Sequence, residues 1–225
     1  MSEFVEPDFD ALRQAMVEVI ATYAQMSAEQ TQRDRFDQRV MTAISGVPRH
    51  AYVPEELQPV AYANIPLPIG HGKTISQPFI VALMTDLLDL DHGDRVLEVG
   101  TGLGYQAAIL AELAGAVYSV EILEELGRDG EQRLHEAGYD NVQVRIGNGA
   151  QGWQDSAPFD KIIVTAAPEL IPTTLIEQLR PGGRMVIPAG LEQQQQLMLI
   201  EKDPDGHLES TEILPVLFSR MITAH

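Results

Sequence analysis

The chain has 225 residues, with 33 acidic and 15 basic side chains and a formal net charge of −18. This length suits one large α/β domain, or one domain with an appendage. Because affinity for nucleic acids rests on basic contacts with phosphates, the acidic balance argues against a nucleic-acid partner. The absence of cysteine excludes disulfides and thiolate metal sites, and it fits a reducing compartment.

The first residues carry no targeting signal that we can identify. Residues 1–10 contain four acids and lack both a basic stretch and a long apolar run, so we expect no signal peptide. The sequence also lacks a run of about 18 apolar residues, so we expect no membrane span and no membrane partner. These features predict a cytoplasmic protein.

The first part of the chain is predicted to be helical. Apolar residues recur at helical spacing over residues 8–30, which predicts a first helix. Polar residues 27–34 are expected to connect it to a second helix over residues 35–45. Gly46 and Pro48 are typical of the end of that helix.

A loop rich in Pro and Gly is expected over residues 53–72. Residues 74–90 are expected to begin as a loop and to continue as a helix, with Pro78 in its first turn. Ser76 is a good candidate for the N-cap of that helix, because its hydroxyl can accept a hydrogen bond from a backbone N–H.

The most informative stretch is the run from Glu98 to Gly104, Glu-Val-Gly-Thr-Gly-Leu-Gly, between a predicted strand and a predicted helix. Glycines at such a turn let the backbone approach a ligand closely. The spacing G-x-G-x-G differs from the dinucleotide fingerprint G-x-G-x-x-G. A carboxylate at Glu98 suits a cation better than a pyrophosphate, which favours the sulfonium cofactor S-adenosylmethionine. We expect this cofactor to contact Glu98, Gly100, Thr101, Gly102 and Gly104.

A second acid, Glu121, ends the next apolar run, residues 117–120. A carboxylate at this position can accept hydrogen bonds from ribose hydroxyls. Two alternatives stay open here: Glu121 can be a solvated strand end, and the glycine turn can be tight without holding a ligand.

From residue 95 onward, predicted strands and helices alternate. Strands are expected near residues 95–99, 116–121, 142–146, 161–165 and 184–188, and helices near 105–114, 123–137 and 170–179. This alternation predicts an α/β fold with a mostly parallel sheet and helices on both faces. A turn is expected at residues 181–183. Residues 195–202 and 210–219 flank Asp-Pro-Asp-Gly at 203–206, which predicts an antiparallel C-terminal hairpin.

Beyond the glycine turn, the chain resembles the protein-L-isoaspartate (D-aspartate) O-methyltransferase family over about residues 36–215. The stretches that carry the resemblance are 47–49, 52–54, 66–78, 95–105, 151–153, 158–160, 162–167, 181–183 and 187–190. Thr-Ile-Ser-Gln-Pro at residues 74–78 is specific to the family. The resemblance implies the Rossmann-like class I methyltransferase fold. We expect N-terminal helices and a substrate-side loop (residues 1–72) packed on an S-adenosylmethionine-binding core (residues 73–225), with the two parts forming one compact domain overall.

The resemblance also implies an activity: methyl transfer from S-adenosylmethionine to the carboxylate of L-isoaspartyl and D-aspartyl residues in damaged proteins and peptides. The ester then closes to a succinimide, which can reopen as aspartate. A carboxylate is ionised at neutral pH, so no general base is needed and catalysis consists mainly of desolvation and alignment. By resemblance, Ser76 is the active-site serine that orients the acceptor. The resemblance further implies that Thr74, Ile75 and Gln77 line the cofactor and peptide pocket and contact the cofactor. It assigns the methionine end to Gly100, the ribose to Glu121, and the adenine to Asn148 and Gly149.

The chain departs from the family pattern at two places near the site. Asn148 stands where the family usually has aspartate, which predicts weaker cofactor binding because a charge-assisted hydrogen bond is lost. Residues 217–221, Leu-Phe-Ser-Arg-Met, replace the common Arg-Phe-Val-Pro-Leu beside the peptide site, which leaves the substrate range open.

Two other functions therefore stay open: a related carboxylate O-methyltransferase with a dedicated peptide substrate, and a non-catalytic cofactor-binding homologue. A methyltransferase acting on nucleobase amines and a dinucleotide oxidoreductase fit the motifs less well. The six histidines have no ligand spacing, so no metal is expected. The sequence gives no indication of oligomeric state.

Overall fold

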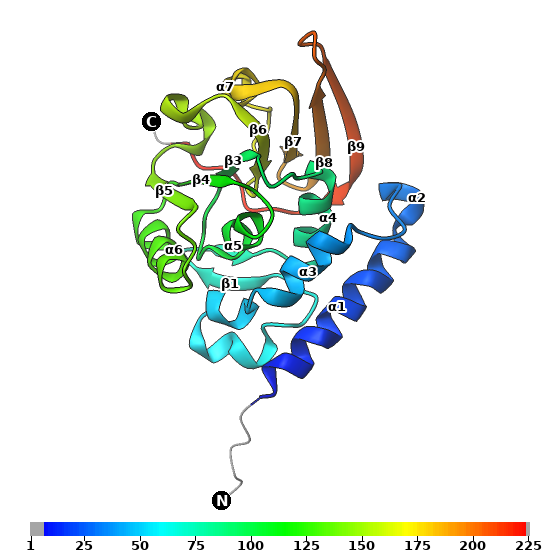
Figure 1. The fold of residues 1–225 in the computed structure, drawn as a ribbon, viewed down its shortest axis with the longest axis vertical. Helices are drawn as coiled ribbons and strands as arrows, with labels where there is room; N and C mark the ends of the chain where they lie inside the picture. Colours follow the sequence, from blue (N-terminus) through cyan, green and yellow to red (C-terminus); the bar gives the residue numbers. More distant parts are fainter. Residues whose placement is uncertain (1–6, 224–225) are drawn as a thin grey trace, which may run out of the picture.

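The computed structural model describes residues 7–223; residues 1–6, which begin the expected N-terminal unit, and residues 224–225 lie outside the described residues. A seven-stranded sheet has the order β5-β4-β3-β6-β7-β8-β9 (Figure 1). The strands are β3 (Arg95–Val99), β4 (Ala116–Glu121), β5 (Val142–Ile146), β6 (Phe159–Val164), β7 (Leu179–Leu191), β8 (Gln194–Lys202) and β9 (Leu208–Val216). Strands β3 to β7 pair in parallel, and β8 and β9 add the antiparallel hairpin. The predicted fold class is confirmed.

The central strands are apolar along their length because both faces of the sheet are covered. In β3, Val96 belongs to the apolar cluster on one face, whereas Leu97 and Val99 belong to the cluster on the other. In β6, Ile163 faces the first cluster and Ile162 the second. This alternation follows from the two-residue period of side chains along a strand.

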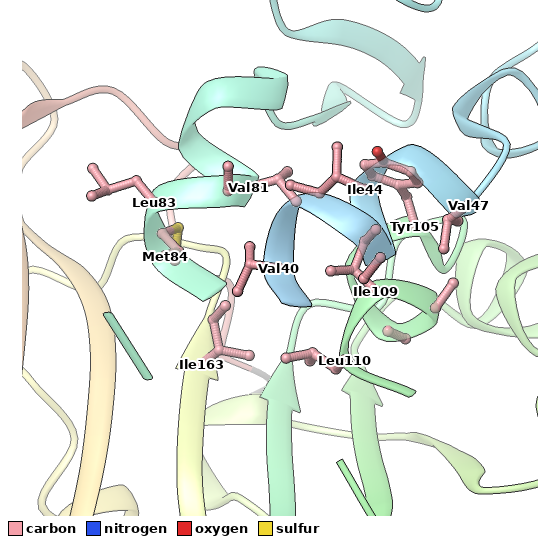
Figure 2. Packing of buried hydrophobic residues seen from close by; sticks show 14 of the residues in the cluster. Val40, Ile44, Val47, Val81, Leu83, Met84, Tyr105, Ile109, Leu110 and Ile163 are labelled. Carbon is pink, nitrogen blue, oxygen red and sulfur yellow. The ribbon is translucent and has the colours of Figure 1, made fainter. Parts of the chain in front are cut away.

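The helices are α1 (Phe9–Met26), α2 (Ala28–Thr31), α3 (Gln38–Gly46), α4 (Pro78–Leu88), α5 (Tyr105–Ala111), α6 (Glu124–Glu136) and α7 (Thr173–Gln178). The first cluster joins α1, α3, α4, α5 and α6 to the sheet, and the second joins α7 to the opposite face. Figure 2 shows Val40 and Ile44 of α3 between the side chains of α4 and α5, near Ile163 of the sheet. The N-terminal helices therefore share one core with the sheet.

Short 3₁₀ segments complete the chain: η1 (Arg49–Tyr52), η2 (Glu55–Val60), η3 (Gly149–Gln151) and η4 (Gln154–Ser156). The strands β1 (Leu67–Gly70) and β2 (Lys73–Ile75) form a small antiparallel hairpin within and beyond the expected 53–72 loop. This hairpin crosses the expected boundary between residues 72 and 73.

Three predicted bounds were wrong, each for a local reason. The expected helix 8–30 divides at Ser27, whose hydroxyl donates to the carbonyl of Tyr23 at 2.8 Å. The helix expected at 170–179 begins only after Pro172, its N-cap residue. The expected turn at 181–183 lies inside β7. The pairing of β6 with β7 shifts register between Phe159 and Lys161, and this irregularity accommodates the three turn residues within the strand.

Candidate functional site

A cavity of about 360 Å³ lies at the carboxyl ends of the parallel strands. Its walls come from the β1–β2 hairpin and the start of α4, the glycine turn after β3, the end of β4, Gly149, residues 165–166 after β6, and residues 215–222. In open α/β sheets, ligands bind in the crevice outside the carboxyl ends of the strands. The volume lies within the range of small-molecule sites.

The glycine turn presents backbone to this cavity. Gly100 and Gly102 line it, and both have positive φ, at 102° and 54°. A Cβ on Gly100 would lie 2.3 Å from Oγ1 of Thr165, whose hydroxyl donates to the Gly100 carbonyl at 2.9 Å. Gly104, also with positive φ at 97°, is the N-cap residue of α5. It is absent from the cavity wall, and its expected cofactor contact stays a prediction. Only glycine fits at Gly100, because a side chain there would displace Thr165.

Glu121 lies in the cavity wall at the end of β4. Its side chain is buried, and its carboxylate accepts hydrogen bonds from the backbone N–H groups of Gly102, Ile122 and Leu123 at 2.9 to 3.0 Å. The alternative of a solvated strand end was wrong. The three bonds fix the carboxylate against the glycine turn, so its remaining lone pairs are held in place for a ligand.

Glu98 lies beneath the glycine turn and is fully buried. The hydroxyl of Ser119, its neighbour across β4, donates to Glu98 Oε2, and Ser119 Oγ lies 2.5 Å from Oγ1 of Thr101. Desolvation by burial raises the pKa of Glu98 to about 8, so the carboxyl group is largely protonated at neutral pH. Glu98 is absent from the cavity wall, and its expected contact with the cofactor's cation stays a prediction.

The residues that the sequence assigned to the cofactor and peptide pocket from the 74–77 loop lie beside the same space, and their expected contacts with the cofactor stay a prediction. Thr74, Ser76 and Gln77 line the cavity, whereas Ile75 and Thr101 line a small adjoining cavity of about 40 Å³. The structure therefore brings the 74–77 loop and the glycine turn to one space, although 22 or more residues separate them.

The interpretation of Ser76 as a helix cap was wrong. Gln77 is the N-cap residue of α4, and no side chain at that position caps the helix. The cap comes instead from Asn64, whose Oδ1 accepts from the backbone N–H of Phe79 at 3.0 Å. Gln77 in turn donates to the carbonyl of Asn64 at 2.8 Å. Ser76 therefore does not cap the helix, and it lines the cavity.

Of the two residues expected to contact the adenine, Gly149 lies in the cavity wall and Asn148 does not. Gly149 lines the cavity, and a Cβ there would lie 2.3 Å from Cγ1 of Val99, so the position requires glycine. Asn148 is the N-cap residue of η3, and its Oδ1 accepts from the backbone N–H of Ala150 at 3.0 Å. Asn148 is absent from the cavity wall, and its expected adenine contact stays a prediction.

The resemblance placed residues 217–221 beside the peptide site, but sequence reasoning missed the contacts that hold residues 217–222 in the cavity wall. Gln195 of β8 is buried and grips the backbone of Phe218 with both amide atoms, at 2.7 and 3.1 Å. Ala167 bonds the segment on its other side, through the Ser219 carbonyl and the Met221 N–H, both at 2.9 Å. A glutamine at an inward position of an apolar strand was the available signal.

Two other groups of polar or aromatic side chains are absent from the cavity wall. Trp153 packs edge-on against Tyr118, with ring centroids 5.6 Å apart. Asp203, Asp205 and His207 gather at the exposed β8–β9 turn, where Asp203 already accepts from His207. Exposed acidic groups of this kind give no reason to assign a metal. Over residues 7–223, no helix combines the length and apolarity that a membrane span requires.

Comparison with known proteins places the chain in a family. The sequence model described as "Protein-L-isoaspartate(D-aspartate) O-methyltransferase (PCMT)" matches residues 22–224. A protein-L-isoaspartate O-methyltransferase 1 of Polaromonas sp. is 58% identical over 214 residues, covering 95% of this chain and 91% of the relative. One from Cupriavidus necator is 52% identical, covering 95% of this chain and 83% of the relative.

Solved structures agree in fold. A protein-L-isoaspartate O-methyltransferase structure matches with a TM-score of 0.79 and 27% identity, over 92% of this chain and 65% of that chain. A Plasmodium falciparum protein solved with S-adenosyl-L-homocysteine matches with a TM-score of 0.78 and 22% identity, over 96% and 99% of the two chains. With a family match over most of its length and relatives above 50% identity, the chain belongs to the protein-L-isoaspartate (D-aspartate) O-methyltransferase family.

Proposed function

We propose that this protein transfers a methyl group from S-adenosylmethionine to the free carboxylate of L-isoaspartyl and D-aspartyl residues in damaged proteins and peptides, and so initiates their repair. One observation carries the proposal: the family-specific 74–77 loop and the glycine turn line one cavity. A methyltransferase needs its acceptor and its methyl donor in such adjoining positions.

The residues of the inner wall fit the cofactor. The fixed carboxylate of Glu121 accepts hydrogen bonds from the ribose hydroxyls, while Gly100, Gly102 and Gly149 let the cofactor approach the backbone. The backbone N–H of Gly104 donates to the carbonyl of Thr101 at 2.9 Å and so closes the turn. When bound, S-adenosylmethionine supplies an electrophilic methyl group on a sulfonium.

The outer wall receives the acceptor. The acceptor carboxylate is already ionised at neutral pH, so the chain needs no base to generate the nucleophile. Ser76 orients the carboxylate by donating a hydrogen bond, and Thr74 and Gln77 exclude water around it. Methyl transfer neutralises the carboxylate.

One observation favours a dedicated peptide substrate as the second candidate. Leu217 lines the cavity in a segment that departs from the common family sequence, and its side chain is 77% exposed. An exposed apolar side chain at a cavity mouth can select for the residues that flank the acceptor. A panel of isoaspartyl peptides with different flanking residues separates the broad from the dedicated activity.

We also propose a cytoplasmic location, which the absence of cysteine supports. The net charge of −18 supports protein and peptide substrates over nucleic acids. We further propose that residues 1–72 and 73–225 act as one unit. Side chains from both segments in the first apolar cluster, and the hairpin that crosses their boundary, support this.

The test is transfer of a labelled methyl group from S-adenosylmethionine to an isoaspartyl peptide and to its normal aspartyl twin. We expect methylation of the isoaspartyl peptide and little of the twin. Equal rates on both peptides would contradict a repair activity. Cofactor binding without transfer to either peptide would favour the non-catalytic homologue.

A further inference from the structure

A fully buried guanidinium lies behind the acceptor wall of the cavity. Arg49 of η1 has an exposed fraction of 0%. Its Nε donates to the carbonyl of Ala61 at 2.8 Å, and its Nη2 donates to the carbonyl of Ser76 at 2.7 Å. Its guanidinium carbon lies 5.0 Å from the ring centre of Tyr105. None of these partners is a carboxylate.

Such a charge is costly to bury. A buried ion normally needs a counter-ion as well as hydrogen bonds, because desolvation removes its hydration energy. Burial lowers the pKa of Arg49 to about 10, which still leaves the group charged at neutral pH. The positive charge therefore persists behind the cavity without a neutralising carboxylate among its described contacts.

The surroundings of Arg49 add polarity to this region. Nη1 of Arg49 and the hydroxyls of Tyr52 and Tyr105 are buried and have no hydrogen-bond partner among the described residues. Both tyrosines, together with Ser76, line the small cavity of about 40 Å³ that adjoins the main one. Unpaired donors and a cation therefore lie behind Ser76. Their positive potential would attract an anion bound in the main cavity toward Ser76.

Arg49 also fixes the geometry of the acceptor loop. Its planar fork presents several donors in rigid directions, so one side chain ties Ala61 after η2 to Ser76 before α4. Ser76 has no cap bond to hold it, so this bond to its carbonyl restrains the residue from behind. A shift of about 1 Å in a residue that orients a nucleophile can cost about a hundredfold in rate.

We propose that Arg49 is a positioning residue for methyl transfer, which restrains Ser76 through its backbone carbonyl and supplies the positive charge that favours the anionic acceptor over its neutral methylated product. The proposal rests on the proposed function, because it concerns the same acceptor carboxylate. It follows that the protein binds the charged acceptor more tightly than a neutral analogue, and that methylation weakens binding and assists product release.

The test compares Arg49→Gln and Arg49→Lys with Arg95→Gln. Arg95 is a matched control, because its Nη2 donates to the Ser156 carbonyl at 2.6 Å and its guanidinium carbon lies 5.3 Å from the ring centre of Tyr118. It begins β3, at the strand end opposite the cavity. Measurements are the KM for an isoaspartyl peptide, calorimetric affinity for S-adenosylhomocysteine, and the thermal midpoint.

We expect Arg49→Gln to raise the peptide KM by about ten- to a hundredfold, because the acceptor carboxylate loses the Coulomb attraction of a buried positive charge, while affinity for S-adenosylhomocysteine is retained. Arg49→Lys keeps the charge but loses the planar fork of donors, so its peptide KM should lie between those of the wild type and Arg49→Gln. Arg95→Gln should lower the thermal midpoint and leave the KM unchanged. If Arg49→Gln fails to fold, the KM of Arg49→Lys decides, because an unaltered value overturns the positioning role.

A second measurement isolates the charge. The peptide is also prepared with a neutral amide in place of the free carboxylate, and the binding of both forms is titrated calorimetrically in the presence of S-adenosylhomocysteine. The ratio of the affinity for the carboxylate peptide to the affinity for the amide peptide should decrease in Arg49→Gln and be retained in Arg49→Lys. An unchanged ratio in Arg49→Gln overturns the electrostatic role, and a joint loss of cofactor and peptide binding makes Arg49 merely structural. Absence of wild-type turnover overturns the proposed function itself, whereas normal wild-type turnover with an unaltered KM in Arg49→Gln overturns only the role of Arg49.

Discussion

Replacing Glu121 by glutamine or alanine tests the cofactor wall of the cavity. In the structure the Glu121 carboxylate already accepts three backbone bonds, from Gly102, Ile122 and Leu123. Alanine removes the proposed acceptor of the ribose hydroxyls and also leaves these three N–H groups without their partner. Glutamine retains one oxygen of similar geometry but loses the negative charge.

The magnitude follows from these contacts. Loss of a charged hydrogen bond costs about 1.5–3 kcal/mol, which corresponds to an increase of roughly one to two orders of magnitude in the dissociation constant. Glu121→Ala should reach this range for S-adenosylhomocysteine, and Glu121→Gln should fall near its lower end. A buried donor left unpaired costs about 1–3 kcal/mol, so the alanine variant should also unfold at lower temperature.

Isothermal titration of S-adenosylhomocysteine and thermal unfolding are measured on the same preparations. The control is Glu124→Ala, which breaks only an exposed pair with Arg128 on α6 and should change neither quantity appreciably. If Glu121→Gln binds the cofactor product as tightly as the wild type, the ribose assignment is refuted. A fall in stability without a fall in affinity would leave Glu121 as a support of the glycine turn alone.

Three further predictions concern other residues of the site. Ser76→Ala should lower kcat far more than it lowers S-adenosylhomocysteine affinity; a collapse of affinity with kcat retained at saturating cofactor would contradict its role. Asn148→Asp keeps the cap on Ala150 and adds charge, so cofactor affinity by calorimetry should rise, and an unchanged affinity would remove the adenine contact. Burial raises the pKa of Glu98 from 4.5 to about 8, so between these values the unfolded state binds fewer protons than the folded state and stability falls as pH rises. In Glu98→Gln this decline of the thermal midpoint should flatten, and parallel pH curves for the two proteins would contradict the shift.

Local sequence patterns were sufficient to predict the sheet and the glycine turn. Strands β3, β4 and β5 occupy the residues expected for them, because short apolar runs that end at glycine or acid are local signals. The turn required only alternate glycines after a strand, and its positive φ values follow from the same local pattern. The loop at residues 74–78 was assigned to the pocket by its resemblance to the family, and no local pattern indicated it.

Packing between distant segments determines how the glycine turn, the 74–77 loop and the C-terminal segment come together around the cavity. Whether Ser76 caps a helix depended on Asn64, which reaches the helix from an earlier loop. The burial of Glu98 and the hold of Gln195 on the C-terminal segment depended on strands paired across the sheet. The proposed role of Arg49 rests on its hydrogen bond to the carbonyl of Ser76, which lies 27 residues away in the sequence. Periodicity and turn chemistry report on neighbours along the chain, whereas burial and partner choice arise from contacts between distant segments, and those contacts exist only in the packed molecule.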